Sequence, residues 1–487
     1  MNKVDYKTLE LKAGLEIHLQ LNTKHKLFCN CLTTMEEKEP MAIVKRKLHP
    51  VASELGEVDI AAQYEYLRNR TFYYQVFKNE TCLIDLDEEP PLPLNKEALE
   101  IALQIALLFN CSIPEEIHVM RKTVIDGSTP MGFQRTMIVG RNGYLKYKNR
   151  KIEITHIALE EDAAAIVKEE NGKVTYRLNR LGIPLVEIGT GLLTDFTPEE
   201  IQEIAYLIGI TCKSTGKVKR GIGTIRQDLN VSIKNGARVE IKGVQELGII
   251  AKVIELEVKR QLELIEKGEK VKEETRAALP DGTTKFLRPL PGAARMYPET
   301  DVEPVIISRK YIRELKRKLP EPWTKKLERF RKELKLSEDL AKQILRSDWL
   351  DLFEQIVKTK KVEASIVANT FVSLLKDLKK RENMKIENLK DKHFIQVFDF
   401  LAKHKIVKEA IPEILKYLAR NPEKSVENVI KELKLEVLSK EELERIVKET
   451  FSPDLSFGKV VGLVMSRVRG RANAQDVIKL VKKFMKK

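Results

Sequence analysis

The chain has 487 residues, which is enough for two to four domains that each bury their own core. Hydrophobic residues make up 43% of it and aromatic residues only 6%, a composition typical of a soluble protein with a core of Leu, Ile and Val. No run approaches the ~18 apolar residues that a membrane span needs, and the N-terminus shows no apolar leader segment. We therefore expect a cytoplasmic protein with no membrane partner, whose five cysteines are reduced thiols.

The net charge of +15 is concentrated near the C-terminus. From Gly458 to Lys487 the chain has nine Lys or Arg residues and a single acid, Asp476. Such a cationic segment is typical of a protein that binds a polyanion such as RNA. On charge alone, a tail that is simply solvated explains the pattern equally well.

The first 305 residues are dominated by short segments in which apolar and polar residues alternate. This period of two predicts strands over 15–21, 184–188, 225–233 and 239–242. Two helices are predicted among them, one over 95–109 and one beginning at Thr197, where Thr-Pro-Glu-Glu supplies a cap, a first-turn proline and a capping-box glutamate. The pattern indicates an α+β domain with an antiparallel sheet.

Beyond residue 305 the alternation gives way to a period of 3.6 residues, interrupted by prolines and by an Asn-Pro pair. Helices are predicted over 324–334, 338–358, 363–380, 408–419, 460–467 and 473–485. We therefore expect three domains: an α+β domain over 1–305, an all-α domain over 306–410 and a small basic helical domain over 411–487.

Several acids and one histidine lie on the polar faces of the predicted strands. A sheet can bring such side chains together, and crowded carboxylates repel one another unless a divalent cation neutralises them. Oxygen ligands with one imidazole suit Mg²⁺ or Mn²⁺. The alternative is a set of salt-bridged acids on solvated strand faces. The candidates are Glu16, His18, Glu187, Asp228 and Glu240, together with the acidic run Glu160-Glu161-Asp162.

Basic and amide residues indicate where phosphates would bind. Arg121-Lys122 and Gln134-Arg135 flank the turn at 126–128, and a Gly-rich basic loop over 219–223 precedes the Asp228 strand. Such groups can hold phosphate oxygens. Because the sequence has no GxxxxGK[ST] motif, any ATP site in it is not a P-loop.

Cys29 and Cys31 are too few ligands for a four-coordinate zinc site. No CxxC or close Cys/His pair follows them, and Cys82 is the only other cysteine in the first hundred residues. We therefore expect buried thiols rather than zinc. The chain also lacks a Ser-Ser-Lys amidase pattern, which predicts that it does not release ammonia from glutamine itself.

Longer motifs resemble the B/E subunit family of tRNA-dependent amidotransferases. They are spread over nearly the whole chain: 14–23 (GLEIHLQLNT), 26–31 (KLFCNC), 159–163 (LEEDA), 178–188 (LNRLGIPLVEI), 224–232 (TIRQDLNVS) and the basic segment 458–473. The resemblance implies a catalytic cradle in the first domain, a helical domain after it, and a small tRNA-binding tail similar to YqeY proteins.

Within the family, the chain resembles the archaeal E subunit more than the B subunit. The segments 121–128 (RKTVIDGS), 132–136 (GFQRT) and 276–282 (RAALPDG) match the E pattern. E subunits usually carry an inserted domain similar to part of bacterial aspartyl-tRNA synthetase before the last of these segments. Here only about ten residues separate Leu264 from that motif, so the insert is expected to be absent.

The resemblance implies an ATP-dependent reaction on a misacylated tRNA. The γ-carboxylate of the glutamate on Glu-tRNA(Gln) is phosphorylated by ATP with Mg²⁺, and ammonia then displaces phosphate to give Gln-tRNA(Gln). Ammonia would come from an asparaginase-like glutaminase, the D subunit, in a heterotetramer of two D and two E subunits. The alternatives are a B-type subunit that works with an amidase-type A subunit, and a tRNA-binding scaffold with no chemistry.

The resemblance also assigns roles to residues in the matching motifs. The residues expected to be catalytic are Glu16, Glu160 and Lys122, with Glu160 as the base that deprotonates ammonium. Met131 takes about the place where B subunits carry a second lysine. The residues expected to bind metal are Glu16, His18, Glu160, Glu187 and Asp228. Those expected to bind the nucleotide are Arg121, Ser128, Gln134 and Arg226. Those expected to bind tRNA are Lys459, Arg467, Arg469 and Arg471.

Overall fold

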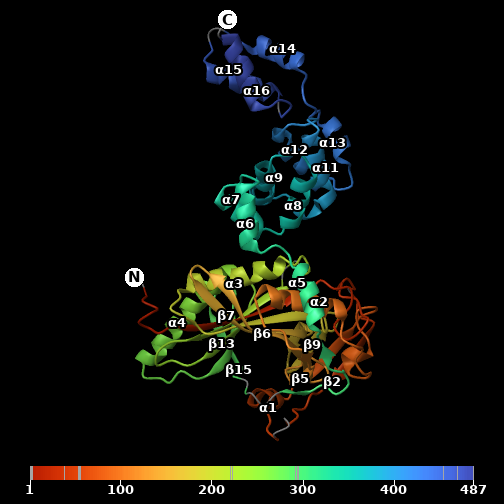
Figure 1. The fold of residues 1–487 in the computed structure, drawn as a ribbon, viewed down its shortest axis with the longest axis vertical. Coiled ribbons are helices and arrows are strands. Elements are labelled where there is room, and N and C mark those ends of the chain that lie inside the picture. Colours follow the sequence, from red (N-terminus) through yellow and green to blue (C-terminus); the bar gives the residue numbers. More distant parts are fainter. Residues whose placement is uncertain are drawn as a thin grey trace. The chain divides into compact units, whose positions relative to one another are not determined.

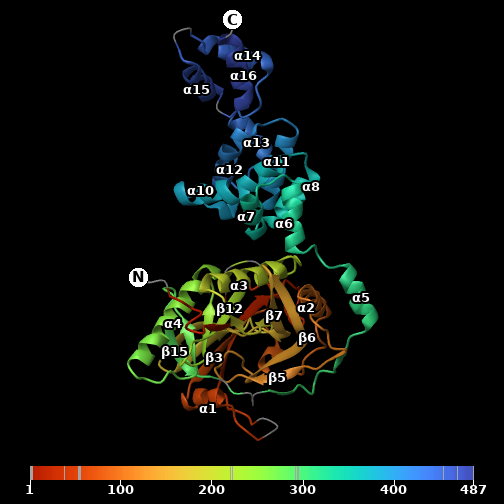
Figure 2. The same ribbon diagram turned by 60° about the vertical axis from the view of Figure 1, so that its left-hand side comes forward.

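The computed structural model describes residues 4–37, 39–52, 56–219, 221, 223–290, 292, 296–452, 455–468 and 470–485. The chain forms two compact units, residues 1–322 and residues 323–487 (Figure 1 and Figure 2). The first unit includes helix α5 (Arg309–Arg317), which packs against α2 (Lys96–Leu108). The predicted change from α+β to all-α is confirmed, and the division of the helical part at residue 410 stays a prediction.

The first unit is built on one large sheet. Its described strands are β1 (Lys12–Gln20), β5 (Met120–Thr123), β6 (Phe133–Tyr147), β7 (Arg150–Glu161), β10 (Pro184–Thr190), β11 (Leu193–Thr194), β12 (Ile225–Ser232), β13 (Val239–Val244), β14 (Glu274–Ala278), β15 (Thr284–Pro289) and β16 (Met296–Pro298). They run in the order β15-β14-β13-β12-β1-β10-β7-β6-β5-β16, and β11 pairs with β1. The pairs are antiparallel, as predicted, except for β13 and β14, which are parallel.

The first unit also contains a smaller sheet, which was not predicted from the sequence. Its strands are β2 (Ala42–Arg46), β3 (Thr71–Val76), β8 (Ala165–Glu170) and β9 (Lys173–Arg177), in the order β2-β3-β9-β8. Its core includes Phe72, Tyr74 and Tyr176, and the centroids of the two stacked tyrosine rings are 5.9 Å apart. This unit also contains helix α1 (Ile60–Leu67) and the two-stranded pair of β4 (Glu116–Ile117) with β17 (Val305–Ile306).

Three helices cover one face of the large sheet (Figure 1). α2 packs on β6 and β7, α3 (Pro198–Lys213) on β1, and α4 (Ile250–Glu266) on β12. The alternation in β1 follows from this cover, because Leu15, Ile17 and Leu19 are at most 1% exposed. Glu16 and His18 point to the other face, which the helices leave to polar side chains.

Local signals in the sequence account for where these helices begin. Asn95 accepts hydrogen bonds from the backbone amides of Glu97 and Ala98 at the start of α2. Thr197 and Glu200 form the predicted capping box of α3, with a proline at the first helical position. Both predicted helices are therefore confirmed.

The connection after α4 is short. α4 ends at Glu266, and after residues 267–273 the strand β14 pairs directly with β13. No inserted domain lies between α4 and β14, as the sequence predicted.

The second unit is all-helical. Its helices are α6 (Trp323–Lys332), α7 (Glu338–Arg346), α8 (Leu350–Thr359), α9 (Ala364–Asn369), α10 (Leu375–Arg381), α11 (Asp391–Ala402), α12 (Ile411–Arg420), α13 (Val426–Glu432), α14 (Lys440–Thr450), α15 (Phe457–Val468) and α16 (Ala474–Met485). The single helix predicted over 338–358 is in fact two helices, because Ser347 adopts an extended conformation that ends α7. The helix predicted over 363–380 contains a π-helical turn at Thr370–Leu374.

The last three helices have a hydrophobic core of their own. It is made of buried aliphatic residues of α14, α15 and α16, including Val447, Val460, Val464, Val477 and Val481. Within the part of the chain that the structure describes, no helix combines the length and the apolar character that crossing a membrane requires.

Arg135 provides a test of the first unit's stability. Its side chain is fully buried, with Nε 2.8 Å from Glu299 Oε2 and Nη1 3.5 Å from Glu161 Oε1. Arg135→Gln leaves the buried Glu161 carboxylate without its cation and removes one of the two guanidinium partners of Glu299, and we expect it to lower the free energy of unfolding by about 3–5 kcal/mol. Hydrogen exchange of β6 and β7 amides as a function of urea measures this loss.

Arg121→Gln is the matched control, because Arg121 pairs with the same Glu299 but its side chain is 20% exposed. We expect it to lose about 1 kcal/mol or less. Equal losses from the two variants would show that burial does not decide the contribution of Arg135.

Candidate functional site

The face of the large sheet opposite the helices gathers the predicted acids. The strand register places Asp228 of β12 beside Glu16 of β1, and Glu187 of β10 beside His18 of β1. Residues paired across neighbouring strands lie on the same face. Ala158 of β7 pairs with Glu187, so Glu160, two residues further along β7, also lies on this face.

His18, Glu160 and Glu187 form a first cluster, in which one ligand atom of each lies within 4.8 Å of the others. His18 Nε2 is 3.2 Å from Glu187 Oε2. Lys122 Nζ donates to Glu160 Oε1 at 2.6 Å and lies 3.6 Å from Glu187 Oε2. Thr136 donates to the same Glu160 oxygen at 2.6 Å. Glu160 is 2% exposed, so these contacts fix a buried carboxylate.

Glu16, Asp228 and Glu240 form a second cluster by the same measure. Lys242 Nζ lies between two of its acids, 2.9 Å from Asp228 Oδ2 and 2.8 Å from Glu240 Oε1. The structure therefore divides the five residues predicted to bind metal between two neighbouring clusters, and Glu240 completes the second.

The acids in these clusters differ in their proton affinity. Burial acts to raise the pKa of Glu187, but Lys122 and two imidazoles hold that pKa well below its usual value. Burial raises the pKa of Glu16, and the neighbouring carboxylates add to the rise against the opposing charge of Lys242. Burial acts to lower the pKa of His18, but contact with Glu187 raises it overall.

Both clusters fit a divalent cation by their chemistry. The second has three carboxylates for one lysine and so an excess of negative charge, and the first, with two carboxylates and one lysine, has such an excess when its imidazoles are neutral. The donors are carboxylate oxygens with a single imidazole, which are ligands that Mg²⁺ and Mn²⁺ accept. The residues that would hold a cation are His18, Glu160 and Glu187 in one cluster and Glu16, Asp228 and Glu240 in the other.

Three further polar residues in this site were missed from the sequence. Thr136, His156 and Lys242 contact the predicted acids directly. Lys242 follows Glu240 on the same strand face, and His156 precedes Glu160 by four residues on β7. The period of two was therefore a signal for both, but the β7 strand itself was not predicted.

Two of the four predicted nucleotide-binding residues lie at this face. Gln134 Nε2 donates to Glu160 Oε2 at 3.1 Å and to the Glu161 carbonyl at 2.6 Å. Arg226 is paired in register with His18 and donates through Nη2 to the buried Asp162 Oδ1 at 2.7 Å. They lie on the two sides of the first cluster.

The other two predicted nucleotide-binding residues are held elsewhere. Ser128 donates through its amide and its hydroxyl to Asp126 within its own turn. Arg121 takes the opposite face of β5 from Lys122, where it lies over the Phe133 ring and pairs with Glu299. The structure does not bring Arg121 to the clusters.

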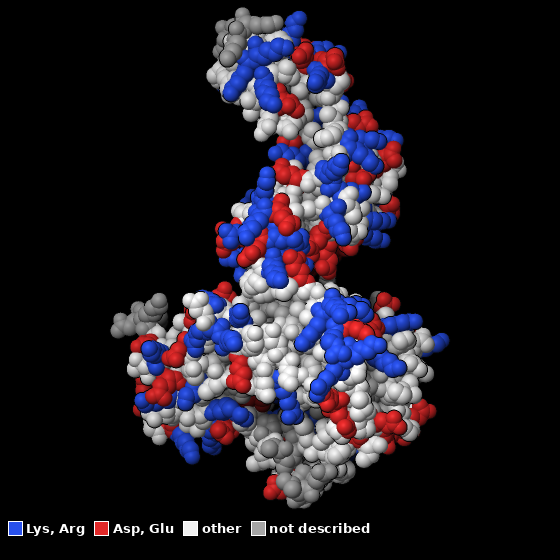
Figure 3. All heavy atoms as spheres, in the orientation of Figure 1, with Lys and Arg blue, Asp and Glu red and all other residues white. Residues whose placement is uncertain are grey.

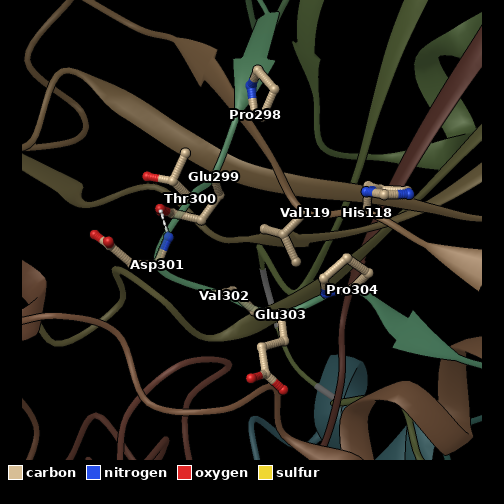
Figure 4. A pocket seen from close by; sticks show the side chains of 9 residues that line it. All are labelled: His118, Val119, Pro298, Glu299, Thr300, Asp301, Val302, Glu303 and Pro304. Carbon is tan, nitrogen blue, oxygen red and sulfur yellow. Dashed lines mark hydrogen bonds between the residues drawn. The ribbon is translucent and has the colours of Figure 1, made fainter.

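Arg121 instead lies next to a surface depression of about 350 Å³ (Figure 4). Figure 4 shows Glu299, Asp301 and Glu303 around it, with His118 at one side. The exposed acids Asp301 and Glu303 line this depression, whereas the Glu299 carboxylate is buried and paired with Arg121 and Arg135, so we assign no nucleotide to it. Of the basic loop that the sequence singled out, Arg220 and Ile222 lie outside the described residues.

Two of the predicted tRNA-binding residues lie on α15, and a third lies in the connection between α15 and α16. Lys459 and Arg467 are exposed on α15, and Arg471 donates through Nε to the Glu436 carbonyl at 3.3 Å. Arg469 lies outside the described residues. Figure 3 shows Lys and Arg side chains gathered on the visible face of this end of the chain.

Comparison with known proteins agrees with this geometry. A family model described as the GatB/GatE catalytic domain matches residues 11–313, and a GatB domain model matches residues 351–485. The chain belongs to the GatB/GatE family. The family's catalytic domain therefore covers both clusters, and its second domain covers the basic helices.

Similar proteins of this family are named as the E subunit of glutamyl-tRNA(Gln) amidotransferase. The protein from Methanocaldococcus jannaschii is 37% identical over 99% of this chain and 100% of its own length. Those from Aeropyrum pernix and Saccharolobus solfataricus are 35% identical, over 99% and 100% of this chain and 98% and 99% of theirs. The first alignment spans 630 positions, more than this chain has residues, so the relative carries a segment that this GatB/GatE chain lacks.

The structure also corrects the reason for excluding zinc from this GatB/GatE chain. The sequence showed no second pair of ligands, but Cys82 and Asp85 provide one. A ligand atom of each lies within 4.8 Å of those of Cys29 and Cys31. Asp85 Oδ2 also accepts from the buried Lys26 Nζ at 3.0 Å. Burial raises the pKa of Asp85 to about 6, against the opposing charge of Lys26.

Three thiols and one carboxylate are donors that Zn²⁺ accepts in a closed tetrahedral site. We expect elemental analysis of protein purified without chelator to find about one zinc ion per chain. Cys29→Ser with Cys82→Ser should remove it, whereas Cys111→Ser with Cys212→Ser, the two cysteines outside the cluster, should not. Wild-type protein that contains no zinc and takes up none when it is added would contradict this prediction.

Proposed function

We propose that this chain activates and then amidates the glutamyl group of Glu-tRNA(Gln), forming Gln-tRNA(Gln) with ATP and ammonia. The observation that supports this most is the polar face of the large sheet. There two neighbouring carboxylate clusters each contain one lysine, and the first of them lies between the amide of Gln134 and the guanidinium of Arg226. The names of the E-type relatives supply the reaction, and the geometry supports a site that joins phosphate to a carboxylate.

The first step makes an inert carboxylate reactive. A carboxylate is a poor acyl donor because oxide would have to leave. In the proposed step an oxygen of the glutamyl γ-carboxylate attacks the γ-phosphorus of ATP, the bond to the β–γ bridging oxygen breaks, and ADP leaves. A divalent cation, when bound, spreads the charge of the transferring phosphoryl group. Gln134 and Arg226 orient the phosphates, and Lys122 neutralises the acids nearby.

The second step replaces phosphate by nitrogen. The lone pair of ammonia attacks the acyl carbon, and inorganic phosphate leaves with the electrons of the C–O bond. The nitrogen must lose a proton, and we assign Glu160 as the base that accepts it. Glu160 suits this role because it is buried, it faces the same cluster, and Lys122 and Thr136 fix its position.

Partners complete the proposed reaction. Because the sequence shows no amidase pattern, ammonia is proposed to come from an asparaginase-like D subunit, in a heterotetramer of two D and two E subunits. The basic face of α15 is proposed to bind the folded tRNA through its phosphates, while the aminoacylated end reaches the sheet of the first unit.

The direct test supplies ammonia without a partner. We expect the chain alone, incubated with Glu-tRNA(Gln), ATP, Mg²⁺ and ammonium chloride, to form Gln-tRNA(Gln). Glu187→Gln should lower this activity by at least about 100-fold, because it removes a charge from the first cluster, while tRNA binding is retained. Chromatography of the amino acid released from the tRNA measures the product.

Glu263→Gln is the matched control, since Glu263 is an exposed residue on the surface of α4. It should keep full activity. A wild-type chain that binds the tRNA but forms no Gln-tRNA(Gln) under these conditions would reject the enzyme and leave a tRNA-binding scaffold.

The proposed contact between α15 and tRNA predicts how tRNA affinity depends on salt concentration. Replacing both Lys459 and Arg467 by Gln should weaken tRNA binding and reduce the slope of log K against log salt by about 1–2, because up to two phosphate contacts are lost. Filter binding at several salt concentrations measures the slope.

The control replaces both Lys424 and Lys431 by Gln. Lys424 lies between α12 and α13 and Lys431 lies on α13, both are paired with glutamates, and neither is part of α15. The control should leave the salt slope unchanged. If the two double variants change the slope equally, the contact is spread over the helical unit and α15 has no special role.

A further inference from the structure

We infer that His156 is a positioning residue that fixes the Glu187 carboxylate for metal binding; this rests on the metal role in the proposed function. His156 Nε2 lies 3.0 Å from Glu187 Oε1. The other oxygen, Oε2, faces His18 Nε2 at 3.2 Å and Lys122 Nζ at 3.6 Å. The two oxygens of one carboxylate therefore have separate partners.

The backbone is shaped to place this histidine. In the pairing of β7 with β10, Gly189 pairs with His156 and Thr190 with Ile154, so Thr155 has no partner and forms a bulge. Thr155 and His156 are consequently both half-buried on the polar side, whereas Ile154 is fully buried. The alternation of β7 itself places His156 on the face of Ala158 and Glu160, and the bulge brings the Thr155 hydroxyl to the same side, next to the imidazole.

Both sides of the imidazole ring are fixed. Thr155 Oγ1 lies 3.0 Å from His156 Nδ1 and donates to the Gly189 carbonyl at 3.1 Å. The ring lies over Gly189, where an added Cβ would be 2.3 Å from His156 Cε1. The glycine thus leaves room for the ring, because any other residue at 189 would displace it.

The contact with His156 determines which oxygen of Glu187 is left to bind a cation. His156 occupies Oε1, so Glu187 presents Oε2 on the side of His18 and Glu160, where a cation would be held. Without His156 the carboxylate is free to rotate and loses this preset orientation. Outer partners of metal ligands typically change metal affinity by about 10–100-fold.

Direct metal binding tests this role without catalysis. Full-length protein is titrated with Mn²⁺ and followed by electron paramagnetic resonance, with no ATP or tRNA present. We expect His156→Ala to weaken Mn²⁺ binding by about 10-fold or more, and His156→Gln to keep most of the affinity because its amide N–H replaces Nε2–H. His118→Ala is the matched control, since His118 is an exposed residue paired with Glu116 at 3.1 Å.

A double variant tests whether Gly189 affects metal binding by leaving room for the His156 ring. Gly189→Ala should weaken Mn²⁺ binding as His156→Ala does, and the double variant should be no weaker than His156→Ala alone, because the added methyl acts by displacing the ring. Fully additive losses would overturn this arrangement. Unchanged Mn²⁺ affinity in His156→Ala would overturn the inference itself, whereas a wild type that binds no Mn²⁺ would reject the metal role in the proposed function.

Discussion

The register of β12, β1, β10 and β7 is the constraint on which the rest of the site depends. Side chains alternate along a strand, so a slip of one residue would turn Glu16 and His18 toward α3 and expose Leu15 and Ile17. The apolar half of β1 is almost completely buried, and this burial holds the register. The hydrophobic packing that stabilises the unit therefore also sets which acids meet on the open face.

Charge compensation explains how so many acids share one surface. Lys122 lies within the first cluster and Lys242 within the second, and each contacts two carboxylates. An unpaired buried carboxylate would be costly, so the lysines make the clusters compatible with a folded chain. They do not cancel the negative charge, and the remainder is what attracts a cation in the proposed reaction.

The sequence revealed the parts of the fold and site that depend on local patterns. Alternation found β1 and β12, an apolar stretch found α2, the capping box found α3, and the period of two put Glu16, His18 and Asp228 on polar faces. It could not find the Cys82 and Asp85 ligands, because they lie some fifty residues from Cys29 and meet it only through tertiary packing. His156 was missed because the β7 strand was not predicted, and the pairing that holds Arg121 away from the clusters could not be found because Glu299 is remote from it in sequence.

The short connection between α4 and β14 has a consequence for how this family can change. β14 and β15 are the outermost strands on that side of the large sheet, several strands away from the first cluster. Lengthening a loop adds only a slowly growing entropic penalty, so a whole module can be gained or lost at such an edge while the interior pairing stays intact. β14 links this edge to the site through Thr275, which donates to Glu240 of the second cluster, so a change in the connection can leave the first cluster untouched.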